Sequence, residues 1–104
     1  MNNTIRSRVP VTEILAGLAE ECSELAQAAL KLRRVFDNTN PTPVTEEEAM
    51  EKLYEEIADV KLYCSMMDIP ARYISEIMRR KEERWEMRLL ENMHGQTEKC
   101  LKHD

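Results

Sequence analysis

The sequence predicts an all-α protein, and three observations lead to this fold class. The 104 residues include only 2 glycines and 4 prolines, whereas glutamate, lysine, leucine, alanine and methionine, which favour helices, are abundant. β-Branched residues do not gather into runs that would indicate strands. Apolar residues recur instead with the 3.6-residue period of amphipathic helices. A chain of this length forms one domain around one hydrophobic core.

The first two predicted helices are separated by a segment that cannot be helical. Thr12 is a candidate N-cap for a first helix over residues 12–36, which follows the apolar period. Residues 37–43 then contain two prolines and a cluster of turn-forming side chains. A capping box, Thr-x-x-Glu at residues 45–48, predicts that a second helix covers residues 45–67.

A third helix is predicted over residues 71–92. Pro70 precedes it, and proline is suited to the first turn of a helix. Gly95 and the polar residues around it predict a flexible tail over residues 93–104. The helical domain is therefore expected to cover residues 1–92.

The second helix carries apolar residues on more than one face. Leu53 and Ile57 lie on one face of a helical wheel, and Ala58 and Leu62 lie on another. A helix that is apolar beyond one stripe has to be covered on more than one side. We therefore expect a bundle of three main helices whose core is completed by another copy of the chain.

The composition also excludes several classes of protein. No apolar stretch approaches the roughly 18–20 residues that cross a bilayer, and residues 1–10 lack the apolar region of a secretory signal. The 3 cysteines are an odd number without CxxC spacing, which argues against a disulfide scaffold or a zinc ribbon. A net charge of −5 argues against nucleic-acid binding, which requires neutralisation of phosphates. The sequence predicts an acidic cytoplasmic protein without a membrane or nucleic-acid partner.

Acidic residues interrupt the apolar stripes of the first two helices in the same way. Glu21 points within about 20° of the first stripe, and Glu24 lies about 60° further round. Glu56 and Asp59 repeat this arrangement on the second helix. The residues assigned to the two stripes, cysteines included as small buried apolar groups, are Ile14, Leu18, Cys22, Leu25, Ala29 and Leu32, and Ala49, Leu53, Ile57, Val60, Cys64 and Met67.

Acids at positions i and i+3 project from adjacent turns, so each pair converges on one point. If the two helices pack antiparallel, four carboxylates face a single cavity, where like charges repel and lose hydration. Either strongly raised pKa values or bound cations resolve this conflict, and hard oxygen donors suit Mg²⁺ or Mn²⁺. On the third helix Lys81 falls on the apolar stripe with Arg84 and Arg88 beside it. These cations suit an anionic ligand, and phosphate is the natural candidate.

Two other interpretations stay open. The acids could decorate the surface of a helical interaction protein, which would bind its partner through the second apolar face and show no dependence on cations. A di-iron carboxylate bundle also places four acids between helices, but it uses Glu-x-x-His. The third positions after Glu21 and Glu56 are occupied by Glu24 and Asp59, so this motif is absent.

The order of these motifs resembles one protein family. Glu20-Glu21-Cys22-Ser23-Glu24 matches EExxE, Glu56-Ile57-Ala58-Asp59 matches ExxD, and Lys81-x-x-Arg84 follows. Over residues 10–90 the chain resembles the MazG-like all-α nucleoside triphosphate pyrophosphohydrolases, especially the short single-domain members of phages and prophages. Either acidic motif alone is common in helices, whereas the two in this order are specific.

The resemblance implies a function and a set of site residues. The family hydrolyses a nucleoside triphosphate to the monophosphate and pyrophosphate and forms homodimers or homotetramers. It implies Lys81 and Arg84 as phosphate contacts, and Glu21 or Glu24 as the group that aligns the attacking water. Candidates for base recognition are Asn38, Asn40 and Tyr63. The Mg²⁺ ligands that the motifs imply are Glu21, Glu24, Glu56 and Asp59, the same four acids that the helical wheels select.

Overall fold

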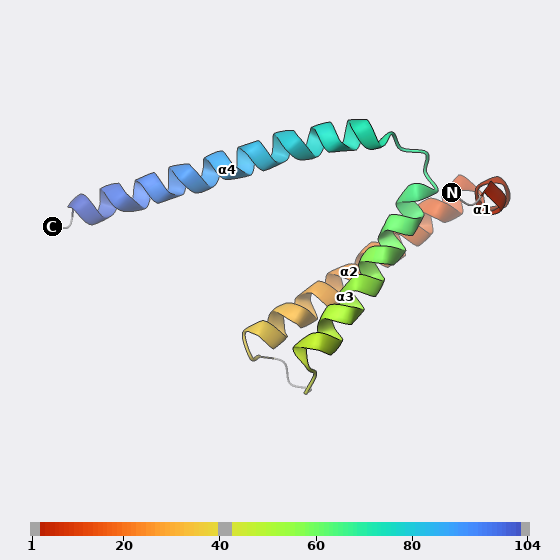
Figure 1. The fold of residues 1–104 in the computed structure, drawn as a ribbon, viewed down its shortest axis with the longest axis horizontal. Helices are drawn as coiled ribbons and strands as arrows, with labels where there is room; N and C mark the ends of the chain where they lie inside the picture. The colour runs from red at the N-terminus through yellow and green to blue at the C-terminus, as the bar shows by residue number, and fades with distance from the viewer. Residues whose placement is uncertain (1–2, 40–42, 103–104) are drawn as a thin grey trace. The chain divides into compact units, whose positions relative to one another are not determined.

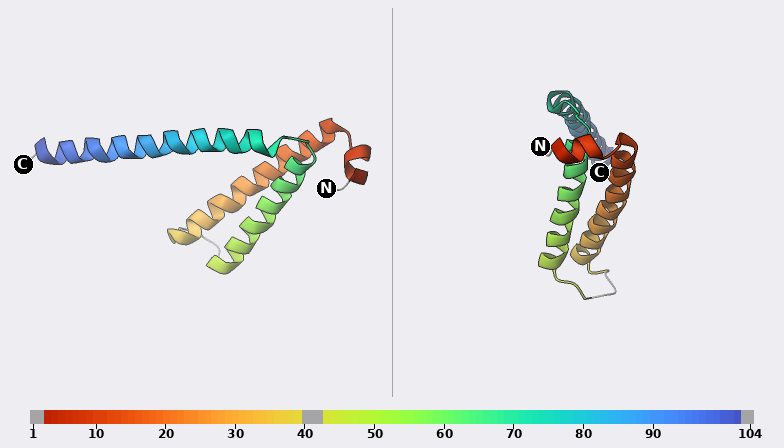
Figure 2. Two further views of the ribbon diagram at one scale, coloured as in Figure 1. Left: turned by 45° about the horizontal axis from the view of Figure 1, so that its top comes forward. Right: turned by 90° about the vertical axis from the view of Figure 1, so that its right-hand side faces the viewer.

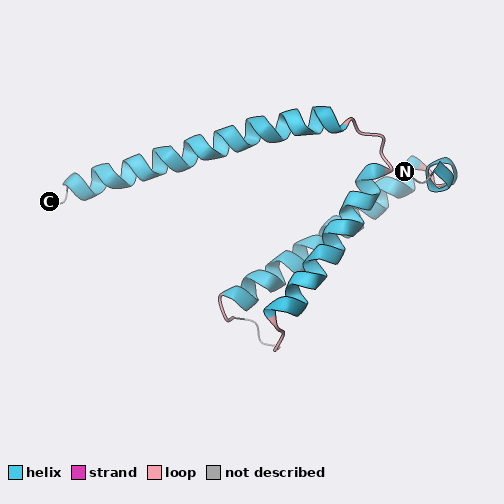
Figure 3. Ribbon diagram, in the orientation of Figure 1, coloured by secondary structure: helices cyan, strands magenta, loops and turns pink. Residues whose placement is uncertain are grey.

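The computed structural model describes residues 3–39 and 43–102. These residues form helices and loops without any strand, which confirms the predicted all-α class (Figure 3). Residues up to Asp68 form one compact unit, and residues from Ile69 onward form a second. Within the described part of the chain, no helix has the length and hydropathy that a transmembrane segment requires. The helices are α1 (Asn3–Arg8), α2 (Val11–Phe36), α3 (Glu46–Ser65) and α4 (Ala71–Lys102) (Figure 1).

Helix α2 begins one residue before the predicted start and ends where predicted. Pro10, not Thr12, occupies the N-cap, and its carbonyl oxygen accepts hydrogen bonds from the backbone N–H groups of Glu13 and Ile14 at 3.0 and 3.1 Å. A proline fits here because the N-cap has an extended backbone, with ψ of 147°, and its missing N–H is not required by any hydrogen bond within the helix. After Phe36, Asn38 adopts a φ of 58°, a left-handed conformation that asparagine tolerates and that terminates the helix.

Helix α3 begins at the predicted cap. The Oγ1 atom of Thr45 accepts a hydrogen bond from the backbone N–H of Glu48 at 3.1 Å, which satisfies one free donor of the first turn. The helix ends at Ser65, two residues before the predicted end. Asp68 closes the following turn with a φ of 56°, which a short polar side chain tolerates.

The sequence analysis did not predict α1. This helix has six residues, none of them buried, so it presents no apolar period to detect. Arg6 forms an ion pair with Asp68, which joins α1 to the turn after α3 within the first unit.

The predicted end of the last helix was wrong, because α4 continues through residues 93–102 instead of giving way to a tail. Gly95 costs only about 1 kcal/mol relative to alanine inside a helix, and no proline follows Pro70 in the sequence. A local breaker signal was therefore too weak to stop a long helix. Residues 103–104 lie outside the described part.

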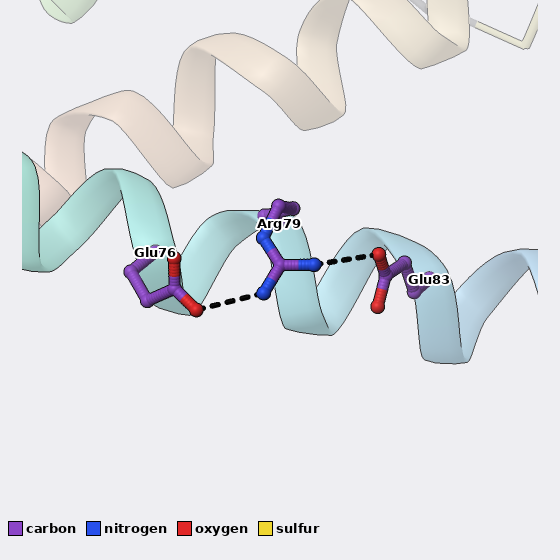
Figure 4. Close-up of polar contacts among 3 residues, drawn as sticks. All are labelled: Glu76, Arg79 and Glu83. Atoms are coloured by element: carbon purple, nitrogen blue, oxygen red, sulfur yellow. Dashed lines mark hydrogen bonds and ion pairs between the residues drawn. The ribbon is translucent and has the colours of Figure 1, made fainter.

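Surface ion pairs run along α4. The guanidinium of Arg79 donates to carboxylate oxygens of Glu76 and Glu83, one turn before and one turn after it, at 2.7 Å each (Figure 4). Pairs at this spacing add about 0.2–0.5 kcal/mol each to an isolated helix. These contacts stabilise α4 from within the helix itself.

Helices α2 and α3 pack side by side in antiparallel orientation and enclose the core of the first unit (Figure 2). Their covered positions alternate by four and three residues, which is the seven-residue repeat of paired helices. Each of these positions is buried or half-buried. The members of the repeat are Ile14, Leu18, Glu21, Leu25, Ala28, Leu32 and Val35 on α2, Ala49, Leu53, Glu56, Val60 and Tyr63 on α3, and Met67 in the turn after α3.

This repeat corrects part of the predicted stripes. Cys22, Ala29 and Cys64 are exposed, whereas Ala28 is buried with 6% of its surface accessible. A straight helical wheel turns 100° per residue, but the contact line between two paired helices follows 3.5 residues per turn. Over several turns the covered face therefore shifts by one residue, away from the two cysteines.

Candidate metal centre

Two glutamates occupy core positions of the seven-residue repeats on facing helices. Glu21 replaces an apolar residue between Leu18 and Leu25 on α2, and Glu56 does so between Leu53 and Val60 on α3. The side chain of Glu56 is only 4% exposed, and Glu21 is half-buried. The helical repeat that forms the core therefore also turns these two carboxylates towards each other.

Three carboxylates meet at this point. One oxygen each from Glu21, Glu24 and Glu56 lies within 4.8 Å of the others. Glu24 is exposed and stands at the open side of the group, one turn after Glu21. The cluster thus passes from a buried acid on α3 to an exposed acid on α2.

Two oxygens of the cluster have unmet bonding requirements. Oε2 of Glu21 and Oε2 of Glu56 are buried and have no hydrogen-bond partner. Leaving a buried charged oxygen unpaired costs at least about 1–3 kcal/mol, so native structures rarely contain one without a reason. A hard divalent cation bound between the carboxylates would satisfy both oxygens, and the all-oxygen donor set suits Mg²⁺ or Mn²⁺. The residues therefore fit the metal that the sequence predicts.

The surroundings of Glu21 disfavour its ionised form. Burial raises the pKa of Glu21 above its ordinary value, and the negative charges of Glu24, Asp59 and Glu56 raise it further. A bound cation would oppose this effect by favouring ionisation of Glu21.

A lysine that the sequence analysis missed contacts the cluster. The Nζ atom of Lys52 lies 2.9 Å from Oε1 of Glu56, and its side chain is 59% exposed. The hydrogen bond to Glu56 raises the pKa of Lys52. The sequence signal was the spacing of Lys52 and Glu56, four residues apart on one helix, which commonly allows an ion pair.

The acids border an open pocket between α2 and α3. Its volume is about 340 Å³, within the range of small-ligand sites. It brings two carboxylates together with two lysines and one amide, and each of the two helices contributes both an acid and a lysine. The lining residues are Glu24, Gln27, Ala28, Lys31, Lys52 and Glu56.

Comparisons of the chain with protein families, curated proteins and solved structures found no match. The chemistry of the site is therefore inferred from its own side chains.

The structure brings three of the four predicted metal ligands together. Asp59 is half-buried and close enough to raise the pKa of Glu21, but it is not part of the three-oxygen cluster. Its side chain is one carbon shorter than that of glutamate and projects from the shoulder of α3. Asp59 as a metal ligand stays a prediction.

The predicted phosphate contacts lie in the second unit. Lys81 and Arg84 are exposed on α4 and line a pocket of about 390 Å³ together with Trp85 and Arg88. A lysine and two arginines beside an indole suit an anion with an attached ring. The role of Lys81 and Arg84 towards phosphate stays a prediction.

The candidates for base recognition are separated along the first unit. Asn38 is exposed in the turn after α2, and Asn40 lies outside the described residues. Tyr63 packs its ring against Gly17, where a Cβ atom would lie 2.6 Å from the ring carbon Cζ. Tyr63 is therefore held against α2 because position 17 has no side chain, which indicates a packing role for its ring.

Proposed function

We propose that this protein is a Mg²⁺-dependent nucleoside triphosphate pyrophosphohydrolase that cleaves between the α and β phosphates. The observation that carries the proposal is the meeting of Glu21, Glu24 and Glu56 with two buried carboxylate oxygens that have no partner. Mg²⁺ typically retains waters and completes its shell with substrate phosphates when one or a few carboxylates hold it. The EExxE and ExxD motifs, which contain these acids, support the same reaction by resemblance.

The three acids differ in position, and this suggests different tasks. Glu56 is buried and held by α3, so it suits a fixed ligand; Glu21 lies opposite it on α2. Glu24 faces the open pocket, where it can orient a water and accept its proton, a role that Glu21 could share. A bound Mg²⁺ supplies charge stabilisation at the phosphoryl oxygens and lowers the pKa of coordinated water. By the same resemblance, Lys81 and Arg84 of the second unit stay predicted phosphate contacts.

The test is a panel of nucleoside triphosphates incubated with the full chain and Mg²⁺. We expect nucleoside monophosphate and pyrophosphate in equal amounts, and no turnover when EDTA removes the cation. Chromatography of the nucleotides together with separate assays for phosphate and pyrophosphate resolves the products. Release of single phosphate would contradict cleavage between the α and β phosphates. The proposal includes a cytoplasmic location, where nucleoside triphosphates are used.

We also propose that copies of the chain associate through α4. Its apolar side chains are widely exposed, and Trp85 retains 65% of its surface. Many large apolar side chains exposed on one helix support an interaction site there. The exposed apolar residues of α4 are Tyr73, Ile74, Met78, Trp85, Met87, Leu89, Leu90 and Met93.

Light scattering is expected to give a mass at least twice the 12.2 kDa of one chain. Trp85→Glu would place a charge on the apolar surface and should shift the mass towards that of one chain, whereas Glu82→Gln, on the same helix, should not. A wild-type protein that is monomeric in dilute solution would contradict self-association. It would favour the alternative that the exposed surface binds a different protein.

A further inference from the structure

Lys52 places a positive charge within the candidate metal centre. Its Nζ contacts Oε1 of Glu56 at 2.9 Å, and Glu24 lies close enough for its charge to act on the ammonium group. The contact satisfies one oxygen of Glu56 and leaves Oε2 of the same carboxylate without a partner. The lysine therefore neutralises the cluster only in part.

The ammonium group of Lys52 would be repelled from its contact with Glu56 if a divalent cation bound there. A cation among Glu21, Glu24 and Glu56 would lie within a few ångströms of Nζ, and like charges at that distance repel. The lysine side chain is 59% exposed, so the ammonium can exchange its contact with Glu56 for contact with water. Its long flexible stem lets the ammonium move without disturbing α3.

The pocket contains a second lysine with which the displaced ammonium could bind an anion. Lys31 of α2 lines the same pocket, with Gln27 one turn before it on that helix. Two ammonium groups and one amide donor then border a space of about 340 Å³ next to the carboxylates. Lysine ammonium groups are common partners of phosphate oxygens, to which they offer up to three donors.

We propose that Lys52 holds the place of the divalent cation in the free protein and, once displaced, joins Lys31 in binding the phosphate chain of the substrate. This inference rests on the proposed function and adds two phosphate-binding residues in the first unit to the predicted pair on α4. Cation binding and anion binding are thereby coupled through one side chain. The pocket accepts a polyphosphate in full only after the metal is bound.

The experiment measures binding by the full chain without turnover. Mn²⁺ alone is titrated and followed by electron paramagnetic resonance, and inorganic pyrophosphate is then titrated in the presence of saturating Mg²⁺ by calorimetry. Lys52→Met removes the charge but keeps the length of the stem. We expect its affinity for Mn²⁺ to rise about fivefold, because the competing positive charge is gone, and its affinity for pyrophosphate to fall at least about tenfold.

Two further variants separate charge from folding. Lys61→Met is the matched control, because Lys61 lies nine residues along α3 and about 180° away, and both affinities should equal those of the wild type. Lys52→Arg retains the charge, so its affinity for Mn²⁺ should stay within about twofold of the wild type. Lys31→Met should weaken pyrophosphate binding without strengthening Mn²⁺ binding.

The outcomes decide the proposal separately from the enzymatic function. Unchanged Mn²⁺ affinity in Lys52→Met, unchanged pyrophosphate affinity, or no binding of Mn²⁺ by the wild type would each overturn it. If the exchange occurs but no nucleoside triphosphate is hydrolysed, the proposed enzymatic function fails and the coupled site remains. If hydrolysis occurs and Lys52→Met binds both ligands as the wild type does, the coupling alone is wrong.

Discussion

Replacing Glu56 by glutamine is expected to lower the rate of nucleoside triphosphate hydrolysis by about three orders of magnitude. The side chain is only 4% exposed, its Oε1 contacts Lys52, and one of its oxygens belongs to the cluster. An amide of the same shape cannot provide the negative charge that holds a divalent cation. Loss of about 4 kcal/mol of stabilisation by the metal corresponds to roughly a thousandfold in rate. Steady-state hydrolysis with saturating Mg²⁺ measures the change.

A neighbouring glutamate provides the control for this experiment. Glu55→Gln makes the same chemical change one residue away, at an exposed position whose contact with Lys52 is 3.9 Å, and should retain nearly full activity. Thermal unfolding of both variants verifies that the helical hairpin is intact. Asp59→Asn is expected to reduce the rate as well if Asp59 completes the metal site. Wild-type turnover in Glu56→Gln would remove the cluster from the mechanism.

The parts of the fold that were predicted correctly depend on local chemistry. A threonine followed three residues later by glutamate marks the start of α3, and the hydrogen bond between Thr45 and Glu48 confirms it. Prolines and turn residues after Phe36 separate the first two long helices as expected. Such signals act within a few residues, so they can be recognised without knowledge of the tertiary structure.

The errors arise where the outcome depends on more than local signals. Ala28 is buried and Ala29 exposed because of where the contact line between α3 and α2 lies on the surface of α2. A helical wheel of one helix holds no information about this contact line. The continuation of α4 past Gly95 is a balance between one weak breaker and a long stretch of favourable residues. The short helix α1 has no buried face that could produce a pattern.

The meeting of Glu21, Glu24 and Glu56 could be anticipated because acids on an apolar stripe violate the apolar pattern, and their role as metal ligands stays a prediction. Glu21 and Glu56 occupy core positions, and a charged residue at such a position stands out in any amphipathic helix. Lys52 was missed for the opposite reason, since an exposed lysine on α3 follows the ordinary pattern and gains its significance only from contact with Glu56. A residue that acts through a partner cannot be distinguished by its own position in the sequence.

Without a divalent cation, the contribution of Glu21 to stability is expected to fall as the pH rises above the ordinary glutamate pKa of 4.5. Burial and the charges of Glu24, Asp59 and Glu56 raise the pKa of Glu21 in the folded state, so the folded protein holds this proton more tightly than the unfolded chain does. The contribution of Glu21 is therefore most favourable below pH 4.5. It declines as the pH rises to the folded-state pKa and is constant above that value.

Glu21→Gln removes this titration and should melt at a higher temperature than the wild type in EDTA. The difference between the two midpoints is expected to grow with pH across that window, whereas Glu20→Gln, an exposed neighbour, should run parallel to the wild type at every pH. Calorimetric scans in buffers of different pH measure the difference between the unfolding midpoints of the variant and the wild type. The titration of all other groups is common to both proteins and cancels in this difference.

Mg²⁺ should reverse the order of the two proteins. A ligand that binds only the folded state stabilises it by about 2.7 kcal/mol when its free concentration is a hundred times its Kd. The wild type has all the carboxylates of the cluster and should show this stabilisation in full. Glu21→Gln lacks one ligand and should gain clearly less at the same concentration. The melting temperatures of wild type and Glu21→Gln could instead run parallel with pH in EDTA and rise equally with Mg²⁺. That result would show that Glu21 faces neither the other acids nor a cation. A carboxylate within the cluster could not leave both measurements unchanged.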